Sequence, residues 1–293
     1  GDPVTAKADL LTLLRNNPKT DESFKALIYN HLAKAYGMTN NSDSALWYIN
    51  LSVSNIPDQS IDKLNALKTR ANIYKIRGEF EKSEVDLLRA LRLNDSIYQD
   101  ASMEISLLQT YSGCCTDRLQ FDKAVKLMLQ ALDSFEKLDT SSNDYYYKKV
   151  KLHIALAECY ASAGYLDRSE KEFDQYLPML LELNDFEGYC RSAIYFSEVL
   201  INSGKLEKAN SLLKVLVSST LKLNNDELLA YIYMLMGRVN SAVGKYNQSL
   251  PDFRKSFAIL EKNHSYYLLD CAKDYLIALR KTNGRNEAVK VLE

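Results

Sequence analysis

The chain has 293 residues, and its 37 Lys and Arg against 38 Asp and Glu leave a formal net charge of −1. This balance does not indicate a nucleic-acid partner, and we expect none for this segment. Ten Gly and five Pro are too few for the many turns of a β-rich protein. No run of eighteen apolar residues occurs, so we expect no membrane insertion by this segment.

Apolar residues recur at three- and four-residue spacing along the chain, which predicts helices. The first helix is expected at 3–16, and seven pairs of helices follow it. The pairs are expected at 22–37/42–54, 60–77/81–94, 101–118/121–137, 145–163/167–182, 186–203/207–222, 226–243/247–262 and 265–281/285–293. We therefore predict an all-α protein: an α-α superhelix, or solenoid, of about seven helix-turn-helix repeats with an extra N-terminal capping helix.

The turns within the pairs follow a common frame. One residue of each turn aligns with the others, at intervals of 38, 41, 45, 40, 40 and 40 residues. These turn residues are Asn40, Gly78, Leu119, Gly164, Gly204, Gly244 and Gly284. Glycine can adopt a positive φ, which ends the first helix and lets the chain reverse.

Three further columns keep the same frame. Small residues stand seven residues before the turn residue, at Ala33, Ala71, Ser112, Ala157, Ser197 and Gly237. Small residues also stand five after it, at Ala45, Ser83, Ala124, Ser169, Ala209 and Ser249. Large residues stand nine after it, at Ile49, Leu87, Met128, Phe173, Leu213 and Phe253. Small side chains let two helix axes approach closely, and we expect the large one to fill the space between neighbouring pairs.

These columns resemble the tetratricopeptide repeat (TPR) family over roughly residues 22–293. The period near 40 is longer than the family's usual value of about 34, and the proline that usually closes a unit is absent. The resemblance implies a long-period TPR array, similar to TPR sensor regions of bacterial regulators. Residues 1–293 are then a single array, with a break into two sub-arrays near 138–146 as the alternative, because a polar run lies there.

Neither catalytic residues nor a metal or cofactor site is predicted. The five cysteines form no C-x-x-C pair, and the three histidines lack the spacing of a metal-binding motif. His153 falls in a packing column, so a core or half-buried histidine is expected. Cys115 falls in a column of tyrosines, so it is expected to be buried. The run Tyr145–Tyr147 has two interpretations, helix-interface packing or a stacking platform. We predict that the chain is not an enzyme.

The first helix of each pair lines the inner face of such a solenoid. Reading that face at helical spacing gives a candidate partner-binding groove. Its residues are Asn30, Lys34, Asn65, Lys68, Asn72, Lys75, Gln109, Lys151, Glu158, Arg191, Glu198, Tyr231 and Arg238. The N-terminal half is rich in Lys and Asn, which suit a carboxylate or a peptide backbone. The alternative interpretation is a charged face that binds only solvent.

One binding mode of the TPR family clamps the terminal carboxylate of a peptide with five residues. Lys68, Asn72 and Lys151 look like three of them. Thr110 and Ala155 stand where the other two would be, so the clamp is incomplete.

The resemblance implies a non-catalytic module that binds a protein or peptide, and it leaves two hypotheses open. In the first, the chain is the ligand- or partner-sensing TPR region of a larger bacterial regulatory protein. The long period and the sequence D-S-I-Y at 95–98 favour it. This hypothesis predicts a parent chain that continues past Glu293 and a periplasmic location for the segment. In the second, the chain is a stand-alone TPR adaptor or scaffold for complex assembly, for which a cytoplasmic location stays open.

Overall fold

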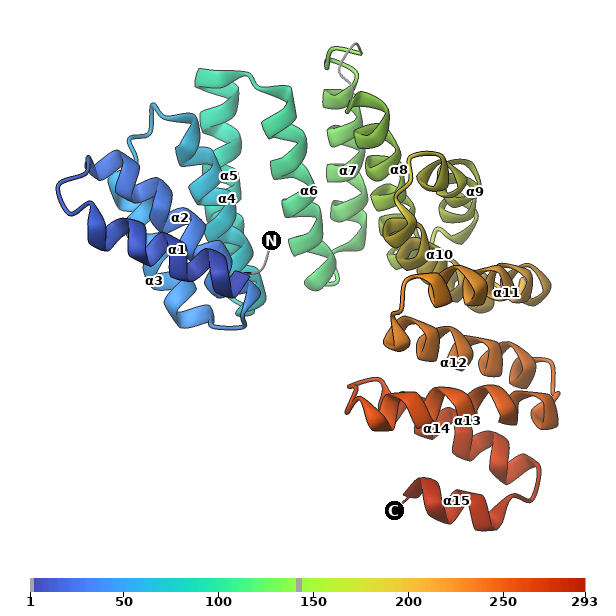
Figure 1. Ribbon diagram of the computed structural model, residues 1–293. Coiled ribbons are helices and arrows are strands. Elements are labelled where there is room, and N and C mark those ends of the chain that lie inside the picture. The colour runs from blue at the N-terminus through green and yellow to red at the C-terminus, as the bar shows by residue number, and fades with distance from the viewer. Residues whose placement is uncertain (1–2, 141–143, 293) are drawn as a thin grey trace. The chain divides into compact units, whose positions relative to one another are not determined.

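The computed structural model describes residues 3–140 and 144–292, and in these residues the regular structure is helical, without a β-strand. Successive helices of each unit run antiparallel, each beside the one before it (Figure 1). Their bounds are α1 Pro3–Asn16, α2 Glu22–Met38, α3 Ser42–Asn55, α4 Ile61–Ile76, α5 Phe80–Leu93, α6 Ala101–Asp117, α7 Phe121–Phe135, α8 Tyr145–Ser162, α9 Leu166–Glu182, α10 Phe186–Asn202, α11 Leu206–Lys222, α12 Asp226–Ala242, α13 Tyr246–Lys262, α14 Leu268–Lys281 and α15 Arg285–Leu292. One π-helical turn, η1, follows α5 at Asn94–Tyr98. The predicted capping helix and the seven helix pairs are confirmed.

The chain divides into two compact units, Gly1–Tyr145 and Tyr146–Glu293. The segment 138–146, where the sequence placed the alternative break, spans this boundary, and its residues 141–143 lie outside the described part of the chain. The single continuous array stays a prediction, and each unit is described by itself.

The turn residues adopt the left-handed backbone conformation that the frame requires. Asn40, Gly78, Leu119, Gly164, Gly204 and Gly244 all have positive φ, between 55° and 79°. The seventh turn corrects the prediction, because Asn283 (φ 59°) takes this conformation and Gly284 does not. Moving the frame by one residue places Ala288 five residues after the turn, as in the other repeats. Gly284 instead leaves room for the side chain of Leu279, since an added Cβ would lie 2.7 Å from Cδ2 of Leu279.

The three columns form the core of each unit. Every member of the two small columns is buried, and so is every large residue that follows nine positions after a turn. The fit is closest at Gly237, where an added Cβ would lie 2.6 Å from Cε1 of Phe253. A larger side chain would therefore separate α12 from α13, which is the physical reason for a small residue at this position.

A second set of left-handed residues joins one pair to the next, and the sequence analysis missed it. These residues are Gln99, Asn184, Asn224 and His264, with φ between 49° and 58°. Asparagine tolerates this conformation better than most residues. The sequence signal was present as L-N-D at 183–185 and L-N-N at 223–225, 40 residues apart.

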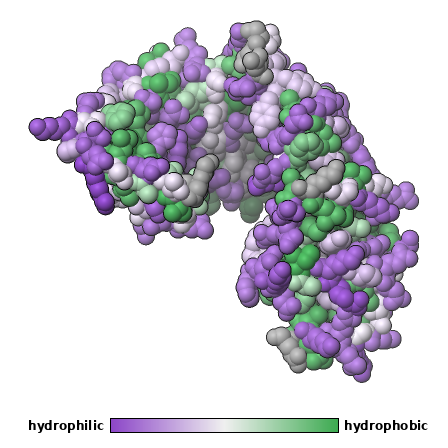
Figure 2. Space-filling view, viewed as in Figure 1, coloured by the Kyte–Doolittle hydropathy of each residue, from purple (hydrophilic) through white to green (hydrophobic). Residues whose placement is uncertain are grey.

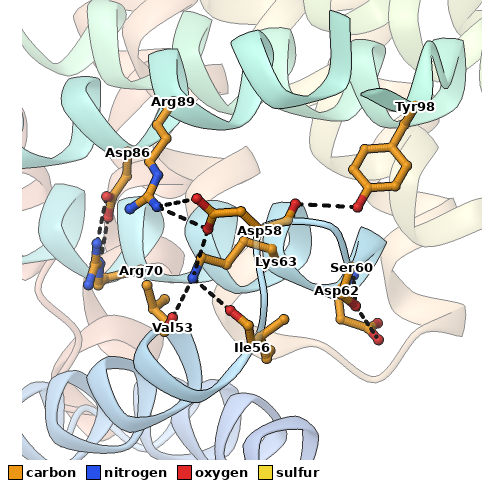
Figure 3. Close-up of polar contacts among 10 residues, drawn as sticks. All are labelled: Val53, Ile56, Asp58, Ser60, Asp62, Lys63, Arg70, Asp86, Arg89 and Tyr98. Atoms are coloured by element: carbon orange, nitrogen blue, oxygen red, sulfur yellow. Dashed lines mark hydrogen bonds and ion pairs between the residues drawn. The ribbon is translucent and has the colours of Figure 1, made fainter. Parts of the chain in front are cut away.

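Polar contacts around the buried Lys63 hold the junction between the first two pairs (Figure 3). Nζ of Lys63 donates to the carbonyl oxygens of Val53 (2.6 Å) and Ile56 (2.8 Å), at the end of α3. Asp58 lies 3.1 Å from the same ammonium group and accepts from Arg89 of α5 at 2.8 Å. Lys63 thus satisfies helix-end carbonyls that would otherwise lack donors.

The first helices of neighbouring pairs also contact one another directly. These contacts join α2 to α4 and α4 to α6 in the first unit, and α10 to α12 and α12 to α14 in the second. In the second unit, the Tyr195 hydroxyl of α10 also reaches the Glu158 carbonyl of α8 at 3.4 Å. We call the surface formed by α2, α4 and α6, and by α8, α10, α12 and α14, the first-helix face of the respective unit.

Hydrophilic side chains dominate the visible surface, with apolar patches between them (Figure 2). Among the helices of the described residues, none has both the length and the hydropathy needed to cross a bilayer.

Candidate functional site

In the first unit, two lysines give the first-helix face its positive charge. Lys68 of α4 is half-buried, and its Nζ donates to Oγ of Ser106 on α6 at 2.7 Å. Burial, together with the neighbouring Lys34 of α2, lowers the pKa of Lys68. Neither ammonium group forms an ion pair with any residue in 3–140 or 144–292, so their charge is uncompensated there.

Amide side chains lie on the same helices. Asn30 precedes Lys34 by one turn and is only 4% exposed, yet its Oδ1 has no hydrogen-bond partner among the described atoms. Asn65 and Asn72 of α4 are half-buried. The buried oxygen of Asn30 is a polar atom that lacks its usual compensation.

The remaining predicted residues of this unit lie at the α4–α6 contact. Nζ of Lys75 lies 3.6 Å from Oδ2 of Asp117, so this lysine is already paired. An added Cβ at Gly113 would lie 3.6 Å from the same nitrogen, and Gln109 is half-buried on α6. The free positive charge of this face therefore belongs to Lys34 and Lys68.

In the second unit, three of the predicted residues line one pocket of about 450 Å³. Arg191 and Glu198 come from α10 and Tyr231 from α12. We call it the tyrosine pocket, and its walls are Arg191, Ile194, Tyr195, Glu198, Asn225, Glu227, Leu228, Tyr231, Tyr266 and Tyr267. Tyr266 and Tyr267 precede α14 and were not predicted, because they stand outside the repeated helical columns.

A second pocket, of about 250 Å³, shares Tyr195 and Glu198 with the first and adds the predicted Arg238. Nε of Arg238 donates to Asp274 of α14 at 2.5 Å. The Tyr231 hydroxyl donates to Oε1 of Glu198 at 2.5 Å. Burial and this carboxylate raise the pKa of Tyr231. Glu198 is thus held at a fixed position between the two pockets.

The last two predicted residues lie on α8. Nζ of Lys151 is 3.4 Å from Asp185, which precedes α10, and 5.9 Å from the ring centre of Tyr147. Glu158 is half-buried, and its burial raises the pKa of its carboxyl. Lys151 belongs to the second unit and Lys68 and Asn72 to the first, so the incomplete carboxylate clamp stays a prediction.

The histidine and the cysteine that the sequence assigned to packing columns, His153 and Cys115, have packing contacts in the structure. His153 stacks on Tyr176 with ring centres 3.8 Å apart, and its Nδ1 lies 2.9 Å from Glu172. Cys115 is 1% exposed, and burial raises the pKa of its thiol to about 11. Cys115 is therefore buried, and His153 is half-buried, as expected. No group of three His, Cys, Asp or Glu suited to a metal ion occurs in the described residues.

The first unit also contains an unpredicted cleft of about 1030 Å³. It lies between α5, η1, α6 and α7, and it is lined by Leu88, Arg92, Asp95, Glu104, Asp133 and Lys137 among others. Both basic and acidic side chains line this cleft. The cleft is the main competitor of the first-helix face as a binding surface.

The repeated left-handed turns and the buried small and large columns define a TPR-like helical solenoid. No model of a known protein family matches the chain. The regulatory protein RapD of Bacillus subtilis (strain 168) is 29% identical over 167 residues, which make up 51% of this chain and 47% of RapD. The match therefore spans about half the length of that relative.

Two solved structures show the same fold. A tetratricopeptide repeat protein from Parabacteroides merdae ATCC 43184 superposes with a TM-score of 0.62 at 17% identity, over 95% of this chain and 93% of that one. A Rap protein complexed with competence and sporulation factor superposes with a TM-score of 0.63 at 14% identity, over 95% and 80% of the two chains. The fold implied by the resemblance to TPR proteins is confirmed.

Proposed function

We propose that this chain is a non-catalytic binding module that holds a segment of a partner protein or a peptide on its first-helix face. In this proposal it is the partner-sensing TPR region of a larger bacterial regulator. The similarity to RapD, a regulatory protein, supports the regulatory part. The solved Rap protein that is complexed with competence and sporulation factor supports the binding part.

The observation that carries the proposal is the uncompensated polarity of the first unit. A half-buried ammonium group without a carboxylate partner costs free energy, as the lowered pKa of Lys68 indicates. A buried amide oxygen without a donor, such as that of Asn30, adds to this cost. A ligand that brings a carboxylate offsets the cost at Lys68, which is partly exposed. An acidic peptide segment supplies such a carboxylate.

The stand-alone adaptor remains the second candidate, because it would use the same face. The two candidates predict different sequences beyond residue 293 of the natural protein. A sensor region continues into an effector or a membrane helix, and an adaptor ends nearby.

The binding proposal is tested with a phage-displayed library of short linear peptides, selected on the full chain. The affinity of each selected peptide is then measured for the wild type and for Lys68→Ala/Asn72→Ala. We expect peptides rich in Asp and Glu, and an affinity loss of about tenfold or more in the double variant, because charge-assisted hydrogen bonds are removed.

The matched control is Lys126→Ala, which removes an exposed ammonium group from the second helix α7. Its affinity should equal that of the wild type. Equal affinities for all three proteins, or a library without any saturable binder, would contradict the proposal.

A further inference from the structure

We propose that the tyrosine pocket binds a positively charged side chain, arginine or lysine, of the partner peptide. This inference rests on the proposed function and names the partner chemistry of the second unit. It depends on three features of the pocket: its aromatic walls, its carboxylates, and the pairing of its only lining arginine.

Aromatic rings form much of the wall. The rings of Tyr231 and Tyr267 have centres 4.6 Å apart and planes tilted by 52°. Those of Tyr266 and Tyr267 are 3.9 Å apart. Tyr195 lines the pocket from α10. Rings from three elements therefore surround one space, and the face of a tyrosine ring attracts a cation.

Two carboxylates lie in the same wall. Glu198 accepts the hydroxyl of Tyr231, and Glu227 accepts that of Ser265 at 2.6 Å. Neither carboxylate forms an ion pair with a lysine or arginine of the described residues. Arg238 attracts Glu198 from the neighbouring pocket, but its own ion pair is with Asp274. Both carboxylates are thus hydrogen-bonded, and neither has a direct cationic partner among the described residues.

Arg191, the only cationic residue among the pocket's walls, does not pair with these two carboxylates. Arg191 donates from Nη2 to Oε1 of Glu187 at 2.7 Å, on the exposed side of α10. Glu187 is not one of the pocket's walls. Arg238, beyond Glu198, is bound to Asp274. The pocket therefore has an excess of negative charge.

Aromatic faces combined with carboxylates select organic cations. A guanidinium or ammonium group gains a cation–π attraction and an ion pair at once, both strengthened by partial burial. An acidic side chain would meet like charge. A volume of about 450 Å³ admits the side chain of an arginine or lysine together with adjacent backbone.

The test uses three acetylated and amidated tripeptides, Gly-Arg-Gly, Gly-Lys-Gly and Gly-citrulline-Gly, titrated into the full chain. Citrulline keeps the shape of arginine without its charge. Binding is followed by methyl NMR of Ile194 and Leu228, which line the pocket. We expect saturable shifts of both methyl signals with the arginine or lysine tripeptide, at millimolar affinity, and none with citrulline.

Two variants locate the binding. Glu198→Gln removes the charge and keeps an oxygen that accepts the Tyr231 hydroxyl, and Tyr266→Leu removes an exposed ring. Each should weaken the cationic tripeptide about fivefold. Glu207→Gln, which removes an exposed carboxylate of α11, is the matched control and should change nothing.

The inference is overturned by equal shifts with arginine and citrulline, by absent shifts with both cationic tripeptides, or by unchanged affinity in both pocket variants. Stronger binding of free methylguanidinium than of Gly-Arg-Gly would overturn the claim that the bound cation belongs to a peptide. None of these results bears on the acidic peptides that test the first unit. A failure here is therefore distinguishable from a failure of the proposed function.

Discussion

The residue seven positions before each turn sets how closely two helices approach. Gly237 shows the limit, because the ring of Phe253 occupies the space that a Cβ would need. Ala33, Ala71 and Ala157 are completely buried at equivalent positions. A larger side chain at any of these positions should disturb the packing of a whole repeat, since the core is densely packed.

Ala157→Leu should therefore lower the free energy of unfolding by about 1–3 kcal/mol, the usual cost of overpacking. Urea denaturation measures this directly. The matched control is Ala242→Leu at the exposed end of α12, which should stay within about 0.5 kcal/mol of the wild type. Equal effects at the two positions would show that the small columns do not set the helix spacing.

Glu158 should make stability depend on pH. Burial raises the pKa of its carboxyl, so the folded protein binds this proton more tightly than the unfolded chain does. The buried carboxylate therefore costs no stability below the usual glutamate pKa of 4.5, an increasing amount as the pH rises from 4.5 to the folded pKa, and a constant amount above the folded pKa.

Glu158→Gln should accordingly be more stable than the wild type at neutral pH, with a difference that vanishes as the pH falls below that value. Thermal melting at a series of pH values gives the comparison. A variant that is less stable at neutral pH would show that Glu158 has a stabilising partner.

At the scale of helices and turns, a left-handed residue ends each first helix. Leu119 holds this conformation at a φ of 59°, and its side chain is 74% exposed. Leu119→Gly should raise the free energy of unfolding by about 0.5–1 kcal/mol, because relief of the left-handed strain exceeds the entropic cost of glycine. Chemical denaturation measures the change, and Gly164→Leu should show the opposite sign. Destabilisation by Leu119→Gly would rule out strain at this turn.

Lys63 ends helix α3 by donating to its last carbonyls, and it is only 5% exposed. Lys63→Met keeps the length of the side chain and leaves two buried carbonyls without a donor. We expect a loss of about 2–3 kcal/mol in the free energy of unfolding, measured in urea. Lys126→Met on exposed α7 is the control. A loss below about 0.5 kcal/mol at Lys63 would mean that water replaces the ammonium group.

The order and bounds of the helices followed from the sequence because buried small and large residues recur in one frame. The seventh turn was misplaced by one residue, since glycine was taken as the left-handed residue where Asn283 holds that conformation. The π-helical turn at Asn94–Tyr98 was missed because its wider hydrogen bonding leaves no periodic signal.

The candidate site was only partly predictable. Helical spacing placed Arg191, Glu198 and Tyr231 on one face, where the three line one pocket, and partner binding at this face stays a prediction. It did not identify Tyr266 and Tyr267, because no repeat column includes the segment before α14. Helical spacing also does not reveal which charged residues form ion pairs, because pairing depends on side-chain positions. Lys75, for example, is paired with Asp117.

At the scale of the molecule, the two units present different chemistry on the same type of face. The first has ammonium groups, and the second has tyrosines with carboxylates, that form no ion pair within residues 3–140 and 144–292. The net charge of −1 does not reveal that the positive and the negative groups lie on different units. The Lys68 and Asn72 variants test the first unit, and the Glu198 and Tyr266 variants test the second.

The central claim is that ligands bind to the first helices of the repeats. Photo-crosslinking tests it most directly, with a library-selected peptide that carries a benzophenone group and with mass spectrometry of the attached residues. We predict attachment to α2, α4 and α6, or to α8, α10, α12 and α14 and the segment that carries Tyr266 and Tyr267. Attachment confined to the second helices, or to the cleft residues of α5, η1 and α7 such as Leu88, Asp95 and Asp133, would contradict the claim.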